Sequence, residues 1–217
     1  MAKRYVMLFT RFERFWHWSQ MVLIMVLLLT GFGIHGYFHL FEFETAVNWH
    51  TGAAIGLLVL WVFAIFWHIT TGTWKHYIPT TNGLWRVARF YAYGIFHGER
   101  HPYHKAYWRK HNPLQAISYL ALKLFLFPAI WISGSLYLLY PFWGDIGIAT
   151  GLLTLVASLH TAIAFAILIF VIIHVYLLTT GHSFKEHVMP MINGFDEVYL
   201  SQEEEAYLEK DEPSHIR

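Results

Sequence analysis

The sequence predicts an all-α membrane protein, a polytopic bundle of four transmembrane helices. Two observations lead to this prediction. Of the 217 residues, 56% are hydrophobic and 13% are charged, and the mean hydropathy is +0.40; soluble domains are far more polar. Four apolar segments also reach the roughly 20 residues that a helix needs to cross about 30 Å of hydrocarbon. These segments are residues 19–38, 49–69, 114–140 and 151–179.

The composition also restricts the chemistry. The chain has no cysteine, so disulfides, thiolate metal sites and iron–sulfur clusters held by this chain are excluded. Any redox centre must therefore use histidine, of which there are 15. The net charge of +1 argues against a nucleic-acid partner.

The positions of lysine and arginine predict the orientation. Four precede the first span, seven lie between the second and third spans, three follow the fourth, and Lys123 lies inside the third. Under the positive-inside rule, both termini and residues 72–113 are cytoplasmic. The two short loops, 39–48 and 141–150, then face outward. Their acidic residues are Glu42, Glu44 and Asp145.

The first two spans place one histidine each near opposite faces of the membrane. His17 lies between two tryptophans at the cytoplasmic boundary, where tryptophan is an interfacial anchor whatever the function. Farther along the first span, Gly31 and Gly33 would let a flat macrocycle or a neighbouring helix approach; close helix packing is the commoner cause. The second helix begins on the outer side, so His50 lies near the outer level.

The cytoplasmic segment 72–113 leads into the third span. Aromatic and basic residues alternate at helical spacing within residues 80–98, so this part is predicted to lie along the inner membrane surface. Asn112 and Gln115 are three residues apart, and their amides can share one helix face at the cytoplasmic boundary. They either cap the helix or hold a quinone carbonyl. Pro128 is expected to kink the third helix.

The fourth span contains two histidines, His160 and His174, which are 14 residues apart. In a helix this spacing is within about 40° of whole turns and about 21 Å along the axis. Both imidazoles therefore face the same side at two depths. Each histidine alone is explained by a hydrogen bond inside the bundle, but a pair in this geometry favours two stacked haem irons.

Sorted by depth, the four histidines form two pairs drawn from different helices. His17 and His174 lie near the cytoplasmic face, and His50 and His160 lie toward the outer face, because the second and fourth helices both run inward. A haem iron with two imidazole ligands has no free axial site, which favours electron transfer over oxygen chemistry.

Residues 1–195 are thus predicted to form the membrane domain, and residues 196–217 an acidic cytoplasmic tail, in which the stretch 203–212 is expected to be mobile and solvated. Lys123 is costly in the third span only if its ammonium stays deep. It either reaches the interface or meets a haem propionate.

These motifs resemble the cytochrome b subunits of respiratory membrane complexes, including those of nickel–iron hydrogenases, formate dehydrogenase and thiosulfate reductase. The resemblance covers most of the chain. Its motifs are Arg14-Phe-Trp-His17, His50 at the start of the second span, His111-Asn-Pro-Leu-Gln115, His160 with His174, and Met191-Ile-Asn-Gly194. One departure is Ala54, where relatives have glycine four residues after the second-span histidine.

The resemblance implies a di-haem protein of a bacterial or archaeal cytoplasmic (inner) membrane. An outer haem b would be held by His50 and His160, and an inner haem b by His17 and His174, with Arg14 as a further cofactor-binding residue. Quinone, either menaquinone or ubiquinone, would react near the inner haem. The residues implied at that quinone site are Asn112, Gln115 and His174.

Our interpretation is a membrane anchor that transfers electrons between an outward-facing (periplasmic) redox partner and the quinone pool. The partner would be a hydrogenase small subunit, another iron–sulfur subunit or a multihaem cytochrome c, and membrane lipid surrounds the spans. A histidine-using transporter is the main alternative, although transporters commonly carry acidic residues within their spans and these four spans have none. A purely structural haem-bearing anchor is the third hypothesis.

Overall fold

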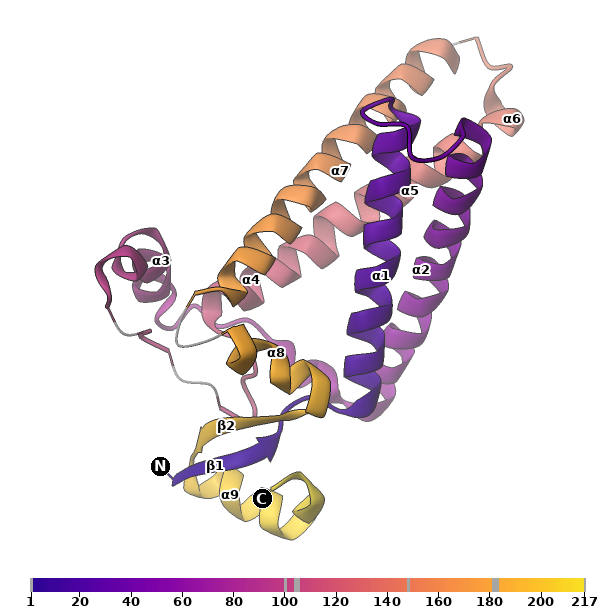
Figure 1. Cartoon of the computed structure of the whole chain (residues 1–217). Helices are drawn as coiled ribbons and strands as arrows, with labels where there is room; N and C mark the ends of the chain where they lie inside the picture. Colours follow the sequence, from indigo (N-terminus) through magenta and orange to yellow (C-terminus); the bar gives the residue numbers. More distant parts are fainter. Residues whose placement is uncertain (1, 100, 104–105, 148, 181–183, 217) are drawn as a thin grey trace. The chain divides into compact units, whose positions relative to one another are not determined.

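The computed structural model describes residues 2–99, 101–103, 106–147, 149–180 and 184–216 (Figure 1). Most of the described chain is helical, and four helices are long and apolar enough to cross a membrane: Arg11–Ile34, Phe43–Thr71, Pro113–Leu138 and Thr150–Leu178. The predicted fold class, an all-α protein with four membrane-spanning helices, is confirmed. The chain divides into two compact units, which are described separately below.

Unit 1 comprises Met1–Ile78, His101–Asn112 and His182–Arg217. Its two long helices, α1 (Arg11–Ile34) and α2 (Phe43–Thr71), pack side by side. The indole N–H of Trp61 in α2 donates to the Gln20 side-chain oxygen in α1 at 2.7 Å.

Helix α1 begins eight residues before the predicted start of the first span because a capping box starts it at Thr10. The Thr10 hydroxyl accepts from the Glu13 N–H at 3.3 Å, and the Glu13 carboxylate accepts from the Thr10 N–H at 2.8 Å.

At the other end of unit 1, strand β1 (Ala2–Met7) pairs antiparallel with β2 (Phe195–Leu200), from Ala2 opposite Leu200 to Met7 opposite Phe195. Helix α8 (Phe184–Asn193) precedes β2, and α9 (Gln202–Asp211) and the short helix η4 (Pro213–His215) follow it. We call β1, β2, α8, α9, η4 and residues 106–112 the terminal layer. One cluster of buried apolar side chains there consists of Val6, Leu8 (which directly follows β1), Tyr107, Val198, Leu200 and Leu208.

The expectation that residues 203–212 are mobile and solvated was wrong, because nearly all of them form α9, which has a buried side. Val198, Leu200 and Leu208 are almost completely buried, at 0%, 1% and 0% exposure. Burying each such side chain stabilises the fold by about 1.5–3 kcal/mol, and this is what orders an otherwise acidic segment. A second capping box, between Ser201 and Glu204, starts α9.

Unit 2 comprises Pro79–Arg100 and Pro113–Gly181. Its long helix α7 (Ala149–Leu178) packs against α5 (Phe127–Leu138). The short helix α6 (Tyr140–Trp143) follows α5. Between the second and third membrane helices, α3 (Leu84–Ala92) and η2 (Gly94–His97) form the predicted helical stretch. Its location on the cytoplasmic membrane surface stays a prediction. The short helix η1 (Thr73–Tyr77) belongs to unit 1, where it follows α2.

The third membrane helix changes to a wider, π-helical turn just before Pro128, the residue at which the sequence predicts a kink. Helix α4 (Pro113–Ala121) is followed by the π-helical turn η3 (Leu122–Leu126) and then by α5. The Phe127 N–H reaches back five residues to the Leu122 carbonyl. Proline has no N–H and its ring crowds the carbonyl four residues earlier, so the wider turn removes that conflict without ending the helix.

Candidate functional site

His50 lies in α2 of unit 1, against the C-terminal half of α1. Its Nδ1 is 3.0 Å from the Thr30 hydroxyl oxygen. That hydroxyl also lies 2.7 Å from the Val26 carbonyl oxygen, to which it donates its own proton. The hydroxyl therefore accepts from an Nδ1–H of His50, and Nε2 carries the lone pair that can bind a metal.

His160 lies in α7 of unit 2 and has the same surroundings. Its Nδ1 is 3.0 Å from the Ser133 hydroxyl oxygen in α5, and that hydroxyl donates to the Ala129 carbonyl at 2.7 Å. The same reasoning places the proton on Nδ1 and leaves Nε2 for a metal. Sequence reasoning missed both Thr30 and Ser133.

The prediction that His160 and His174 lie on one continuous helix is confirmed, since both are within α7. The Nδ1 of His174 lies 3.3 Å from the hydroxyl of Tyr119 in α4, and the His174 ring stacks on Phe170 at 6.0 Å and 11°. Tyr119 was also missed. Nothing in the sequence distinguishes it from the chain's other 12 tyrosines.

His17 is half-buried in α1, where its ring meets the edge of Trp18 at 5.4 Å. The Trp18 indole N–H donates to the Met191 carbonyl of α8 at 2.7 Å. Arg14, predicted to bind the cofactor, donates to the Thr10 carbonyl at 3.4 Å and to the Ile192 carbonyl of α8. These bonds fix α8 to the start of α1; the cofactor role of Arg14 stays a prediction.

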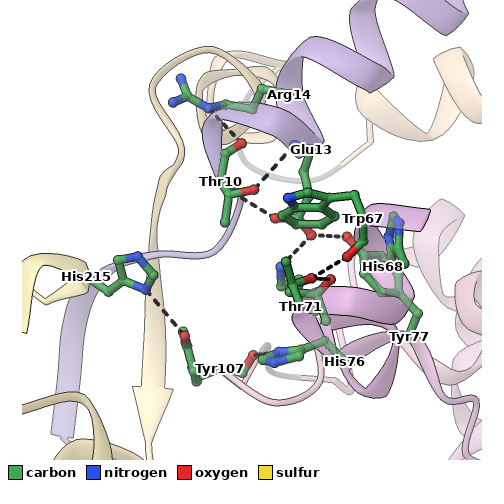
Figure 2. A network of polar contacts seen from close by, with 12 residues as sticks. Thr10, Glu13, Arg14, Trp67, His68, Thr71, His76, Tyr77, Tyr107 and His215 are labelled. Carbon is green, nitrogen blue, oxygen red and sulfur yellow. Dashed lines mark hydrogen bonds and ion pairs between the residues drawn. The ribbon is translucent and has the colours of Figure 1, made fainter. Parts of the chain in front are cut away.

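One turn before His17, the first turn of α1 contributes Glu13, which Figure 2 shows beside Thr10, to a buried ion pair with Lys110. Lys110 Nζ lies 2.7 Å from a Glu13 carboxylate oxygen, and their side chains are 4% and 1% exposed. The Tyr77 hydroxyl donates to the same carboxylate, and the ammonium lies over the Tyr77 ring at 5.5 Å. Burial lowers the pKa of Lys110, and the Glu13 charge opposes that shift.

A second polar group links the loop around Tyr107 to the C-terminal residues (Figure 2). The Tyr107 hydroxyl donates to Glu212 at 2.5 Å, and His215 Nδ1 is 2.5 Å from the same carboxylate. Burial and that hydrogen bond raise the pKa of Tyr107. His76 Nδ1 donates to the Tyr107 carbonyl at 3.2 Å. Burial, and then the Lys110 charge, lower the pKa of His76.

The predicted quinone-site amides fall in different units. Asn112 is 4% exposed at the end of the unit 1 segment that carries Lys110. Gln115 is half-buried in the first turn of α4 in unit 2. The histidine pairs divide in the same way, with His17 and His50 in unit 1 and His160 and His174 in unit 2. Both pairings, and the quinone site, therefore stay predictions.

The histidines fit a haem by their donor chemistry. His50 and His160 each present Nε2 as a neutral acceptor, which is the form that binds iron. A methyl group on Gly31 would lie 3.2 Å from Cε1 of His50, and one on Gly134 would lie 3.2 Å from Cε1 of His160. Glycine at these two positions thus allows each imidazole to lie directly against the neighbouring helix.

Comparison with known proteins gives a family. The family model described as prokaryotic cytochrome b561 matches residues 8–194. The chain is 32% identical over 197 residues to the Escherichia coli (strain K12) protein named "Putative cytochrome YdhU", covering 88% of this chain and 74% of that protein. No solved structure matches the chain.

The match spans all four membrane helices and the four histidines. The resemblance to membrane-bound b-type cytochromes, inferred from the sequence motifs, is therefore confirmed. The chain belongs to the prokaryotic cytochrome b561 family, whose members are membrane proteins that bind b-type haem.

Proposed function

We propose that the chain transfers electrons across the membrane by holding two haems, between a redox partner on the outer side and quinone on the cytoplasmic side. His50 and His160 hold the outer haem, and His17 and His174 hold the inner haem. Membership in a b-type cytochrome family favours this function over the transporter hypothesis. An electron-transfer role also accounts for four histidines in an apolar chain better than a purely structural anchor does.

One observation carries the proposal: within each unit, the two proposed ligands have the same separation along a helix axis. In unit 1, His50 contacts α1 at Thr30, and a methyl on Gly31 would meet its ring; these positions lie 13 and 14 residues after His17 on the same helix. In unit 2, His160 and His174 are 14 residues apart on α7. At 1.5 Å per residue, both separations are about 20 Å.

The chain's own residues supply the coordination. A b-type haem with two imidazole ligands takes up and releases one electron without opening an axial site. The four imidazoles stay neutral in the hydrocarbon because their lone pairs bind metal, which removes the burial penalty of a charge. The two separations above keep one pair near each side of the membrane.

The cytoplasmic-side quinone site uses Asn112, Gln115 and His174. Asn112 is a buried amide, and its N–H₂ group can donate to a quinone carbonyl. Gln115 supplies a second amide from the first turn of α4. In this proposal, the protein is the subunit of a larger oxidoreductase that performs the quinone step, with menaquinone or ubiquinone as the exchangeable substrate.

The outer loops receive the partner. Glu42, Glu44 and Asp145 are the acidic residues of these loops, and their charges would steer a protein with a basic docking face. The chemistry fits an iron–sulfur subunit, such as a hydrogenase small subunit, or a multihaem cytochrome c. The orientation that puts these loops outside rests on the distribution of lysine and arginine.

Haem quantitation of the purified protein tests the proposal. Wild type and the exposed loop variant His97→Ala should contain two b haems per chain, whereas His160→Ala and His174→Ala should contain one each. A quinol analogue should still reduce the remaining haem in His160→Ala but not in His174→Ala. Carbon monoxide should leave the reduced wild-type spectrum unchanged, because both irons have two imidazole ligands. One haem in wild type, or two in either ligand variant, would refute the assignment.

A further inference from the structure

We propose that Thr30–Gly31 and Ser133–Gly134 are a matched pair of positioning sites for the two histidines of the outer haem. Each hydroxyl holds one imidazole with its proton on Nδ1 and its Nε2 toward iron, and each glycine lets that imidazole lie against the helix. This inference rests on the proposed function, because it assumes that His50 and His160 are ligands of one haem.

The two sites agree contact by contact. In each, the hydroxyl oxygen is 3.0 Å from Nδ1 of the histidine and 2.7 Å from the carbonyl oxygen four residues earlier. In each, the next residue is glycine, and a Cβ there would lie 3.2 Å from Cε1. One site is in unit 1 and the other in unit 2, so the same arrangement of hydroxyl, glycine and histidine occurs independently in the two units.

Burial distinguishes these two hydroxyls from others that bond to their own helix. Thr30 and Ser133 are both 2% exposed. Thr154 in α7 also donates to the carbonyl four residues earlier, at 3.0 Å, but it is exposed. A hydroxyl in a membrane helix is already satisfied by that backbone bond. Its second contact, to Nδ1, therefore serves the histidine.

The contact also predicts an electronic effect. A hydroxyl that donates to a carbonyl becomes a better acceptor, so it strengthens its hydrogen bond from Nδ1–H. An outer-sphere acceptor of this kind fixes the ring orientation of a metal-binding histidine and raises its basicity. A more basic imidazole stabilises the ferric form, so Thr30 and Ser133 both lower the reduction potential of the outer haem.

The inner haem would respond differently. His174 has a phenol, that of Tyr119, at 3.3 Å from Nδ1. Tyr119 is on α4; Phe170 is stacked on the His174 ring and meets the Tyr119 ring edge-on. Variants of Thr30 and Ser133 therefore act on one haem of the two. This selectivity separates positioning from general loosening of the membrane helices, which would shift both potentials.

The experiment is a redox titration of each haem in the full-length protein, followed by visible and electron paramagnetic resonance spectra. Thr30→Val and Ser133→Ala remove the hydroxyls, while Thr30→Ser and Ser133→Thr keep them. Thr154→Val removes a back-bonded hydroxyl from α7 and is the matched control. Both hydroxyl-free variants should raise the midpoint potential of the same haem, the double variant should raise it further, and the other three should match wild type.

Each outcome is decisive. Unchanged potentials in Thr30→Val and Ser133→Ala would overturn the inference, although two haems per chain would still support the proposed function. Shifts in two different haems would overturn the shared-haem part of the inference and, with it, the proposed ligand pairing. If Thr30→Val loses a haem that Thr30→Ser retains, the hydroxyl is required and the inference stands. Loss in both variants would mean that shape, not the hydroxyl, holds the histidine.

Discussion

The buried Glu13–Lys110 pair should make unit 1 sensitive to a single change of charge. Glu13→Gln keeps the size of the side chain and its amide oxygen can still accept from the Thr10 N–H, so the capping box survives. It removes both the charge and the acceptor oxygen 2.7 Å from the Lys110 ammonium, and this ammonium is left at 4% side-chain exposure. Leaving one partner of a buried pair uncompensated typically costs about 3–5 kcal/mol.

The chemistry of lysine sets an upper limit on this free-energy cost. An uncompensated ammonium can lose its proton instead of staying charged. At about pH 7.4 this is roughly three units below the ordinary lysine pKa, so deprotonation costs about 4 kcal/mol at about 1.4 kcal/mol per unit. Lys110 will either stay charged or lose its proton, whichever costs less free energy, and that cost is the destabilisation expected. We therefore expect Glu13→Gln to lower the free energy of unfolding by about 3–4 kcal/mol.

The pH dependence identifies the cause. Burial already lowers the pKa of Lys110, and removing Glu13 removes the charge that opposes this shift. The unfolded state then binds more protons than the folded state, so the penalty shrinks by up to about 1.4 kcal/mol for each unit of rising pH. Lys110→Met should show the opposite trend, since it leaves a carboxylate that acid neutralises.

Unfolding by sodium dodecyl sulfate in mixed micelles, followed by tryptophan fluorescence, measures these differences. The matched control is Lys3→Gln, which breaks an ion pair to Glu197 at 2.5 Å whose side chains are 54% and 59% exposed. Such a surface pair contributes at most about 1 kcal/mol. The double variant Glu13→Gln/Lys110→Met should recover much of the loss. A Glu13→Gln penalty that is no larger than the control, or that does not change with pH, would refute the reasoning.

Three further predictions concern other parts of the chain. Gly31→Ala should reduce haem per chain, because its Cβ would lie 3.2 Å from Cε1 of His50, whereas Gly52→Ala, which meets open space, should not; equal haem contents would contradict the close approach. Leu208→Ala, at a side chain with 0% exposure, should destabilise the terminal layer by about 2–5 kcal/mol and expose residues 196–216 to protease, and Glu209→Ala should leave cleavage as in wild type. Burial lowers the pKa of His76, so the unfolded state takes up a proton first and the terminal layer should lose stability as the pH falls below about 6.5. His76→Asn can still donate to the Tyr107 carbonyl and should flatten this dependence of stability on pH. An unaltered dependence would assign the acid sensitivity to Glu212 or another group.

Hydropathy predicted the membrane part of the fold because a span is a property of about 20 neighbouring residues. Hydropathy could not predict where α1 begins, because the first turns of that helix carry Arg11, Glu13 and Arg14, which lower the mean hydropathy there. The capping box of Thr10 and Glu13 was the signal for that boundary.

The terminal layer was missed for a different reason. Its strands pair residues 2–7 with residues 195–200, and a pairing across nearly the whole chain leaves no local pattern. The acidic composition of residues 203–212 then suggested a solvated tail. Composition failed here because the few apolar side chains, among them Val198 and Leu208, are the ones that are buried.

The histidines could be found from sequence, but the groups that hold them could not. An ionisable residue within an apolar span is conspicuous. Thr30 and Ser133 are not, because hydroxyl side chains are ordinary in membrane helices, where they bond to their own backbone. Only the packing of α1 on α2, and of α5 on α7, shows that these two meet imidazoles.

The use of hydroxyls at both positions follows from the hydrocarbon surroundings. A metal-binding histidine needs an acceptor for its Nδ1–H. Backbone carbonyls within a membrane helix are already paired along the helix, and a carboxylate would place an uncompensated charge in the membrane. A threonine or serine avoids both costs, because its proton goes to its own helix and its oxygen still accepts. Thr30 on α1 and Ser133 on α5 are thus the same physical solution, reached once in each unit.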